Sequence, residues 1–429
     1  MRKLYLASAT IIAAVSLLAL AMELVANGLY YSKRGKIYYF DVREPAKPGA
    51  FTAAQAVFHP YYSFIHRVGR DGDWWTTNNM GFQILTRLVK EQPGCCDYPL
   101  AKRDDEVLVG IFGGSAAGGF ALAAQASPEF AAQLGKVPAW SGKRIRILNF
   151  AMPGFKQPQQ LMTLAYFLSL GQRFDLVLNM DGFNEVVTSH SNWKAGAEPS
   201  FPADQLWGAW GRQIENATLA LREGGSDAYL AAYYRSVSGR SKNRAERCRL
   251  AACYEFYGLL STLAQSQADR LDARNRKSEE KVTLFPAGIT STLGPNFDVF
   301  EYAADQWGAS SKAMADMLRS SGAIYLHVLQ PNQWWARAGA YEPISKDHIY
   351  QWVIPLINTG YPKLASRVPG LRNSGVNILD ATMLFREVPS RDVYIDDCCH
   401  LTDKGNALLG TRVAEEVQRL PPAKDVKRP

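Results

Sequence analysis

From Glu106 onward, short apolar runs alternate with segments of helical character, and this alternation constrains the fold more than any other feature. The run "EVLVGIFGG" is continuously apolar and ends on glycines, a pattern typical of a strand that is buried on both faces. Similar runs occupy 144–151, 174–182, 323–331 and 376–382, and helical segments occupy 159–170 and the residues after Thr402. Strands that alternate with helices form a parallel sheet covered on both sides. The sequence therefore predicts an α/β fold with three layers, α/β/α, around a central parallel sheet.

An uncharged stretch follows Arg2 and Lys3 at the start of the chain. It runs over 4–22, which is 19 residues and close to the roughly 20 that a helix needs to cross the hydrocarbon core of a bilayer. The small residues at 19–21 resemble a secretory cleavage site, but the apolar region of a cleaved signal is shorter, roughly 7–15 residues. We favour an uncleaved signal anchor, a transmembrane helix that connects the chain to a membrane, over a cleaved signal peptide. In either case the chain is predicted to be exported, either membrane-anchored and facing the periplasm or cell exterior, or secreted.

These patterns divide the chain into five segments. Residues 1–32 form the anchor or signal, and 33–104 form a connector and lead-in rich in proline and aromatic residues. The α/β domain is predicted in two parts, 105–186 and 297–429, separated by a helical insertion or cap at 187–296. The insertion either shapes a substrate cleft or only adds to the fold. The net charge of +8 is modest for 429 residues and the basic residues form no long block, so nucleic acid is not an expected partner.

Chemically useful residues follow the strands at the points where the predicted strands end. The first strand ends at Ser115, Gly154 follows the second, and Asn184 follows the third. Near the C-terminus, Asp397 precedes His400 by three residues. Binding sites in open parallel sheets form beyond the carboxyl ends of the strands. We therefore expect these five side chains and backbone segments to converge.

The five residues suffice for nucleophilic acyl transfer. A serine hydroxyl needs a neighbouring base to take its proton, and His400 is the predicted base for Ser115. Asp397 would fix the tautomer of the imidazole. The amides of Ser115 and Gly154, with the side chain of Asn184, would form an oxyanion hole for the tetrahedral intermediate. No phosphate-loop lysine or dinucleotide fingerprint aligns at Ser115, and no cofactor is expected.

Four short blocks occur in the order of a known family: "FGGS", "NFAMPG", "DGFNE" and "DDCCHLTDKGN". This order resembles the SGNH (GDSL-type) serine hydrolases, and the upstream "HPYYSFIHR" and "TTNNMGF" resemble a lead-in of their exported or membrane-anchored members. The resemblance covers roughly 58–186 and 323–420. It implies a flavodoxin-like SGNH fold, Ser115 as nucleophile, Gly154 and Asn184 as oxyanion-hole donors, and Asp397 with His400 as the acid–base pair. Gly114 departs from the aspartate that this family has before its serine.

The six cysteines occur as three close pairs, at 95/96, 248/253 and 398/399. Cysteines in an exported chain are compatible with disulfides, but their connectivity cannot be read from sequence. We expect a bridge between the 95/96 pair and the 398/399 pair, which would brace the loop that carries His400. The cysteines form no C-x-x-C and no histidine stands at metal-ligand spacing, so a metal site is not predicted.

Three functions are compatible with these residues. The favoured one is an extracytoplasmic serine esterase that removes short O-acyl groups, such as acetyl, from a small molecule or a polysaccharide through an acyl-enzyme. The second is an O-acyltransferase that uses the same triad but passes the acyl group to a carbohydrate hydroxyl. The third is a catalytically silent SGNH-like binding or assembly subunit of an envelope complex. The tryptophan pairs at 74/75 and 334/335 would either stack on a sugar or fill the ends of the sheet.

Overall fold

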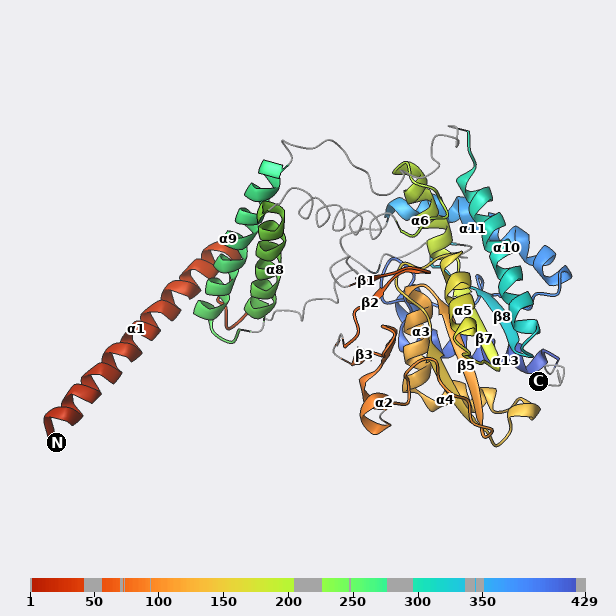
Figure 1. The fold of residues 1–429 in the computed structure, drawn as a ribbon, viewed down its shortest axis with the longest axis horizontal. Coiled ribbons are helices and arrows are strands. Elements are labelled where there is room, and N and C mark those ends of the chain that lie inside the picture. Colours follow the sequence, from red (N-terminus) through yellow and green to blue (C-terminus); the bar gives the residue numbers. More distant parts are fainter. Residues whose placement is uncertain are drawn as a thin grey trace. The chain divides into compact units, whose positions relative to one another are not determined.

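A five-stranded parallel sheet forms the centre of the larger part of the protein, as seen in a computed structural model (Figure 1). The structure describes residues 2–41, 56–69, 72, 74–92, 94–203, 226–246, 248–275, 296–335, 344 and 351–421. The strands of the sheet are β5 (Glu106–Gly113), β6 (Arg144–Asn149), β7 (Leu176–Asp181), β8 (Ile324–Leu329) and β9 (Ile378–Asp380). Each lies within a predicted strand, which confirms the central parallel sheet.

The strand order is β6-β5-β7-β8-β9, with every neighbouring pair parallel. In chain order this is 2-1-3-4-5, an order common in doubly wound sheets. From β5 the chain first crosses to β6 on one side of it. The next connection returns past β5 to β7 on its other side, and the later strands continue outward from there. The carboxyl ends of β5 and β7 therefore mark the topological switch point, the place where such sheets bind ligands.

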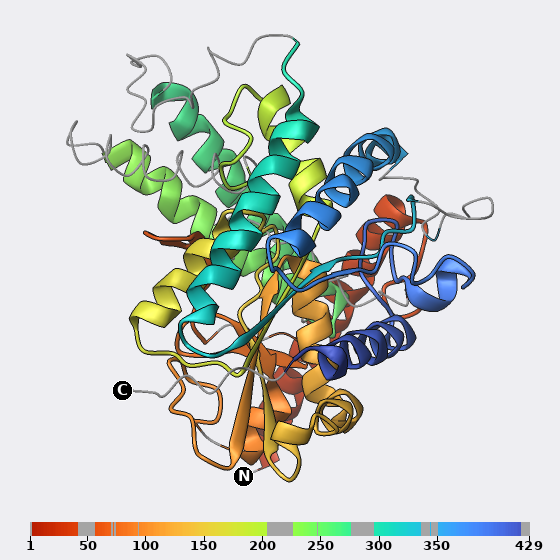
Figure 2. The same cartoon turned by 90° about the vertical axis from the view of Figure 1, so that its right-hand side faces the viewer.

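Helices cover both faces of the sheet, as the three-layer prediction expects. One face packs against α3 (Ser115–Ala126), α4 (Pro128–Leu134) and α13 (Asp403–Arg419), and the other against α5 (Gln159–Ser169), α6 (Phe183–Lys194), α10 (Val299–Arg319) and α11 (Ile354–Asn373). Figure 2 shows α13 beside α3, and α10 beside α5. Alternate residues of β5 supply the two cores: Val107, Val109 and Ile111 face the first layer, and Leu108 and Phe112 face the second. A strand buried on both faces has to be apolar throughout, which is why "VLVGIF" reads as an uninterrupted run.

The segment predicted as a connector contains two small antiparallel sheets. They pair β1 (Ala56–His59) with β2 (Ser63–His66), and β3 (Trp75–Thr77) with β4 (Gln83–Leu85), before α2 (Thr86–Glu91). The short helix α12 (Ser390–Val393) precedes the loop that carries His400. Both small sheets lie within the same unit as the central sheet.

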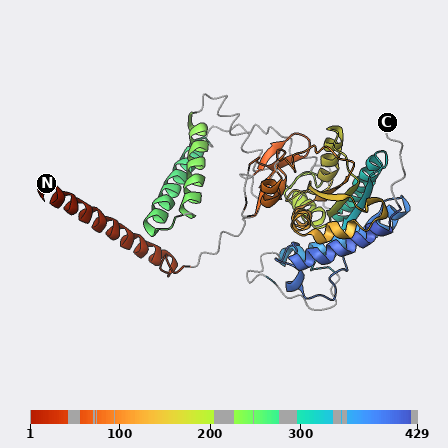
Figure 3. The same cartoon turned by 90° about the horizontal axis from the view of Figure 1, so that it is seen from below.

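A second unit contains the N-terminal helix and the helical segment of the predicted insertion. The chain divides into Met1–Ala50 with Gly211–Leu284, and Phe51–Trp210 with Phe285–Pro429. In the first of these, α8 (Ser226–Glu246) and α9 (Ala251–Asn275) form a helical hairpin, shown side by side in Figure 3. The helix-like run at 215–224 lies outside the described residues. The insertion was predicted to start at 187, but α6 of the larger unit continues to Lys194.

The N-terminal helix α1 spans Arg2–Arg34. Over Ala13–Arg34 it meets the length and composition criterion for crossing a membrane, which membrane anchors and secretory signals both meet. The predicted N-terminal apolar helix is confirmed to this extent.

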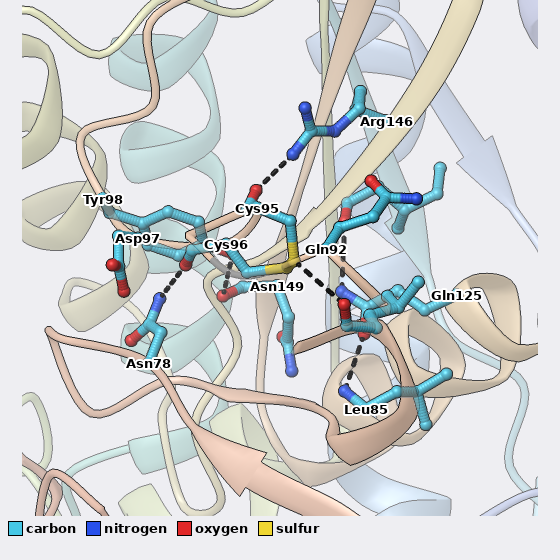
Figure 4. Close-up of a disulfide and its surroundings, with 12 residues drawn as sticks. Asn78, Leu85, Gln92, Cys95, Cys96, Asp97, Tyr98, Gln125, Arg146 and Asn149 are labelled. Atoms are coloured by element: carbon cyan, nitrogen blue, oxygen red, sulfur yellow. Dashed lines mark hydrogen bonds between the residues drawn. A yellow bond between two sulfur atoms is a disulfide. The ribbon is translucent and has the colours of Figure 1, made fainter. Parts of the chain in front are cut away.

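The predicted disulfide between the 95/96 and 398/399 pairs is wrong. The structure instead joins Cys95 to Cys96 (Figure 4), and Cys248 to Cys253. Arg146 of the edge strand β6 holds the carbonyl of Cys95. Cys398 and Cys399 follow α12, and the carbonyl of Cys398 accepts a hydrogen bond from Asn332 in the loop after β8. The 95/96 cysteines are thus hydrogen-bonded to strand β6, and the 398/399 cysteines to the loop that follows strand β8.

Candidate active site

Ser115 is the first residue of α3, directly after β5. The turn between them leaves no room for a side chain at Gly113 and little room at Gly114. Gly113 has a φ of 142°, and a Cβ there would lie 2.0 Å from the carbonyl oxygen of Met180. At Gly114 a Cβ would lie 2.4 Å from Nδ2 of Asn184. The turn therefore requires glycine at position 113, whereas a larger residue at position 114 would have to displace the Asn184 side chain.

The imidazole of His400 links Ser115 to a carboxylate. Its Nε2 lies 2.7 Å from Oγ of Ser115, and its Nδ1 lies 2.5 Å from Oδ2 of Asp396. With the proton on Nδ1, the imidazole donates to Asp396 and accepts from the serine hydroxyl, the arrangement a general base needs. The two residues are 285 positions apart in sequence. The predicted partnership of Ser115 with His400 is present in the structure.

The acid predicted for the triad, Asp397, is not the one bound to His400. Its carboxylate turns away and accepts a hydrogen bond from the amide of Ile344 at 2.8 Å. The neighbouring Asp396 takes the position at the imidazole because its Oδ1 also accepts the amides of Cys398 (3.0 Å), Cys399 (3.1 Å) and His400 (3.3 Å). These bonds fold the loop back so that residue 396, four positions before the histidine, faces Nδ1.

The ionisation of the pair follows from these contacts. Burial raises the pKa of Asp396, but the hydrogen bond and charge of His400, with the backbone amides, outweigh burial and hold this pKa below its usual value. Burial lowers the pKa of His400, but the electrostatic interaction with Cys399 and the hydrogen bond and charge of Asp396 raise it to about 9. The imidazolium form is therefore strongly stabilised.

This pKa predicts an alkaline pH profile. A general base acts only when its imidazole is neutral, so kcat/KM of the free enzyme should rise with pH and reach half of its plateau near pH 9. A pH–rate series on the wild-type protein tests this, and a profile already level at neutral pH would contradict it.

Gly154 and Asn184 lie on the two segments that flank the turn before Ser115. The loop after β6 is fixed to the turn because the amide of Met152 donates to the carbonyl of Gly113 at 3.0 Å. Gly154 follows in this loop, and the carbonyl of Phe155 accepts a hydrogen bond of 2.8 Å from Nδ2 of Asn184. Asn184 is the second residue of α6, next to Gly114. The structure thus brings together the segments of all three predicted oxyanion-hole donors.

Glu185 joins those two segments and was not predicted as a site residue. Its side chain is buried, and its two oxygens accept the amide of Gln157 at 2.9 Å and the amide of Gly182 at 2.7 Å. Burial and the charge of Asp181 raise its pKa above the usual value. A glutamate at the third position of a helix is a recognisable capping signal, but its bond to Gln157 depends on tertiary structure.

Replacing Glu185 with alanine is expected to destabilise this unit. Two buried amides lose their acceptors, at about 1–3 kcal/mol each, so the free energy of unfolding should fall by about 2–6 kcal/mol. Glu129, which is exposed in the first turn of α4, is the matched control, and Glu129→Ala should cost under about 1 kcal/mol. Chemical denaturation measures both, and equal losses would contradict the role of Glu185.

The loop after β8 forms hydrogen bonds to the backbone of the loop that carries His400. Asn332, Gln333 and Trp334 donate side-chain hydrogen bonds to three successive carbonyls, those of Cys398 (3.4 Å), Asp396 (2.8 Å) and Asp397 (2.9 Å). The indole of Trp334 therefore supports the loop that carries His400, whereas Trp74 is 55% exposed.

One group of possible metal ligands lies at this site within the described part of the chain. Cys398, Cys399 and His400 each place one ligand atom within 4.8 Å of the others. The thiols are buried and free, with their sulfurs 3.0 Å apart. Both ring nitrogens of His400 are already bonded to Ser115 and Asp396, so a metal would have to displace one of them.

Comparison with known proteins finds no matching protein-family model and no matching curated protein.

Proposed function

We propose that this protein is a membrane-anchored serine esterase of the SGNH type, which acts outside the cytoplasm on short O-acyl esters. The observation that carries the proposal is the hydrogen-bonded series from Ser115 through His400 to Asp396 at the switch point of the sheet. Such a series activates a hydroxyl for attack on an ester carbonyl. The order of the four sequence blocks supports the family assignment.

The reaction has two halves. Oγ of Ser115 attacks the ester carbonyl carbon while Nε2 of His400 takes the hydroxyl proton. The negative charge on the carbonyl oxygen is stabilised by the amides of Ser115 and Gly154 and by Nδ2 of Asn184. The carbon–oxygen bond to the alcohol then breaks, and His400 returns the proton to the leaving alcohol. Water attacks the acyl-serine with His400 as base, which releases the carboxylic acid and regenerates Ser115.

The proposal is tested by product analysis. Purified full-length protein is offered p-nitrophenyl acetate, longer-chain p-nitrophenyl esters and an acetylated polysaccharide, beside the Ser115→Ala variant. Free carboxylic acid from the wild type alone is the expected result. An acyl group found on an added glycan in place of free acid would instead identify an acyltransferase. Equal turnover by wild type and variant would exclude Ser115 as the nucleophile.

A further inference from the structure

The hairpin of α8 and α9 is attached to α1 at a defined position along that helix, next to Glu23. The carboxylate of Glu23 accepts the first two amides of α9, from Ala251 at 2.6 Å and Ala252 at 3.1 Å. The hydroxyl of Tyr38 donates to the carbonyl of Cys248 at 2.6 Å. Ala26, Tyr30, Tyr38 and Ala251 are buried together between these elements. The turn of the hairpin therefore lies beside residue 23 of α1.

This attachment determines which part of α1 can lie in the hydrocarbon core of a membrane bilayer. By length and composition alone the span could extend over Ala13–Arg34. Residues 23–34, however, include Glu23 and Lys33, and Lys33 forms an ion pair with Glu255 of α9 at 2.5 Å. Charged groups with polar partners are costly to place in the bilayer core. The uncharged stretch 4–22 is thus the part of α1 suited to span the bilayer core. It ends next to Glu23, where the turn of the hairpin contacts α1.

The sequence around this turn, including the last residues of α8, is strongly basic. Residues 240–250, "RSKNRAERCRL", contain five basic residues and one acidic residue. We define the basic tip as the exposed residues Lys242, Arg244, Arg249 and Leu250. Among the described residues, none of its three basic side chains forms an ion pair. Leu250, 55% exposed, adds an apolar side chain next to Arg249.

We propose that the basic tip binds the anionic head groups of the phospholipid leaflet at which α1 leaves the membrane. Each lysine or arginine near an anionic surface strengthens such binding by about fivefold at moderate salt, and the attraction falls off over about 8–10 Å. The position of the turn beside Glu23 places the tip within that range of the head groups. The contact would fix the hairpin on the membrane surface. The inference rests on α1 being a retained anchor and is independent of the chemistry at Ser115.

The test is hydrogen–deuterium exchange on the full-length protein in lipid nanodiscs. The discs contain either phosphatidylcholine alone or phosphatidylcholine mixed with phosphatidylglycerol. We expect the amides of 240–253 to exchange roughly tenfold more slowly with the anionic lipid, and high salt to remove the difference. The test variant is Lys242→Glu, Arg244→Glu, Arg249→Glu, and the control reverses three exposed lysines of the other unit, Lys90→Glu, Lys136→Glu, Lys143→Glu.

The proposal predicts that the test variant loses the lipid-dependent protection and the control keeps it. Equal exchange in both lipids would overturn it. Protection in both lipids that survives charge reversal would also overturn it, because insertion of Leu250 would then explain the contact. Loss of the N-terminal peptide from the isolated protein would overturn the proposal as well, because α1 would then not be a retained anchor. Covalent labelling of Ser115 in the same samples reports separately on the proposed esterase.

Discussion

Replacing Ser115 with alanine is expected to lower kcat by about 10⁶-fold, the loss seen when an activated serine is removed from a triad. The variant should fold normally, because within the described part of the chain the hydroxyl hydrogen-bonds to His400 alone, and alanine is a good residue for the first turn of α3. The measurement is turnover of a short-chain aryl ester, with the free energy of unfolding determined in parallel.

Ser127 provides a matched control for this change. It also stands at the start of a helix, where its hydroxyl accepts the amide of Glu129 at 3.2 Å and caps α4. Ser127→Ala should cost about 1 kcal/mol of stability and leave kcat unchanged. Comparable losses of activity in both variants would point to a general structural effect and away from a nucleophile at 115.

Replacing Asp396 with asparagine is expected to lower kcat by about 10⁴-fold. The amide keeps the size of the carboxylate but no longer stabilises the imidazolium or selects the tautomer with Nδ1 protonated. The pKa of His400 should also fall, because the hydrogen bond and charge of Asp396 are among the causes that raise it to about 9. The pH–rate profile of the variant therefore shifts to lower pH as its plateau drops.

Asp397→Asn is the control that separates the two neighbouring acids. Asparagine retains an oxygen that can accept the amide of Ile344, so this variant should keep its kcat within about threefold, since that bond does not touch His400. The steady-state kinetics of both variants decide the matter. A large loss in Asp397→Asn with a small loss in Asp396→Asn would contradict the role of Asp396 and assign the acid of the triad to Asp397.

The central sheet was predictable because its strands are buried on both faces and must be apolar throughout. Val107 and Leu108 face opposite helical layers and both are buried. The position of Ser115 follows from the same logic, since the end of a buried strand next to glycines identifies the carboxyl edge of the sheet. The sequence therefore contains enough information to pair Ser115 with His400.

The choice between Asp396 and Asp397 was not predictable from residue types, because two adjacent carboxylates precede the histidine. It depends on which carboxylate accepts the amides of Cys398, Cys399 and His400. The same limit applies to Asn332, Gln333 and Trp334, which act on carbonyls more than 60 residues away. The cysteine pairing also depends on tertiary structure, since it is decided by which strands hold the two pairs.

The most direct test of the central claim is the site of covalent modification by a fluorophosphonate. This reagent reacts with a serine only when a base removes the hydroxyl proton. Peptide mass spectrometry of the labelled full-length protein should find the adduct on Ser115, with labelling abolished in Ser115→Ala and strongly slowed in His400→Ala. An adduct on a different serine, or equal labelling after either substitution, would contradict an activated hydroxyl at position 115.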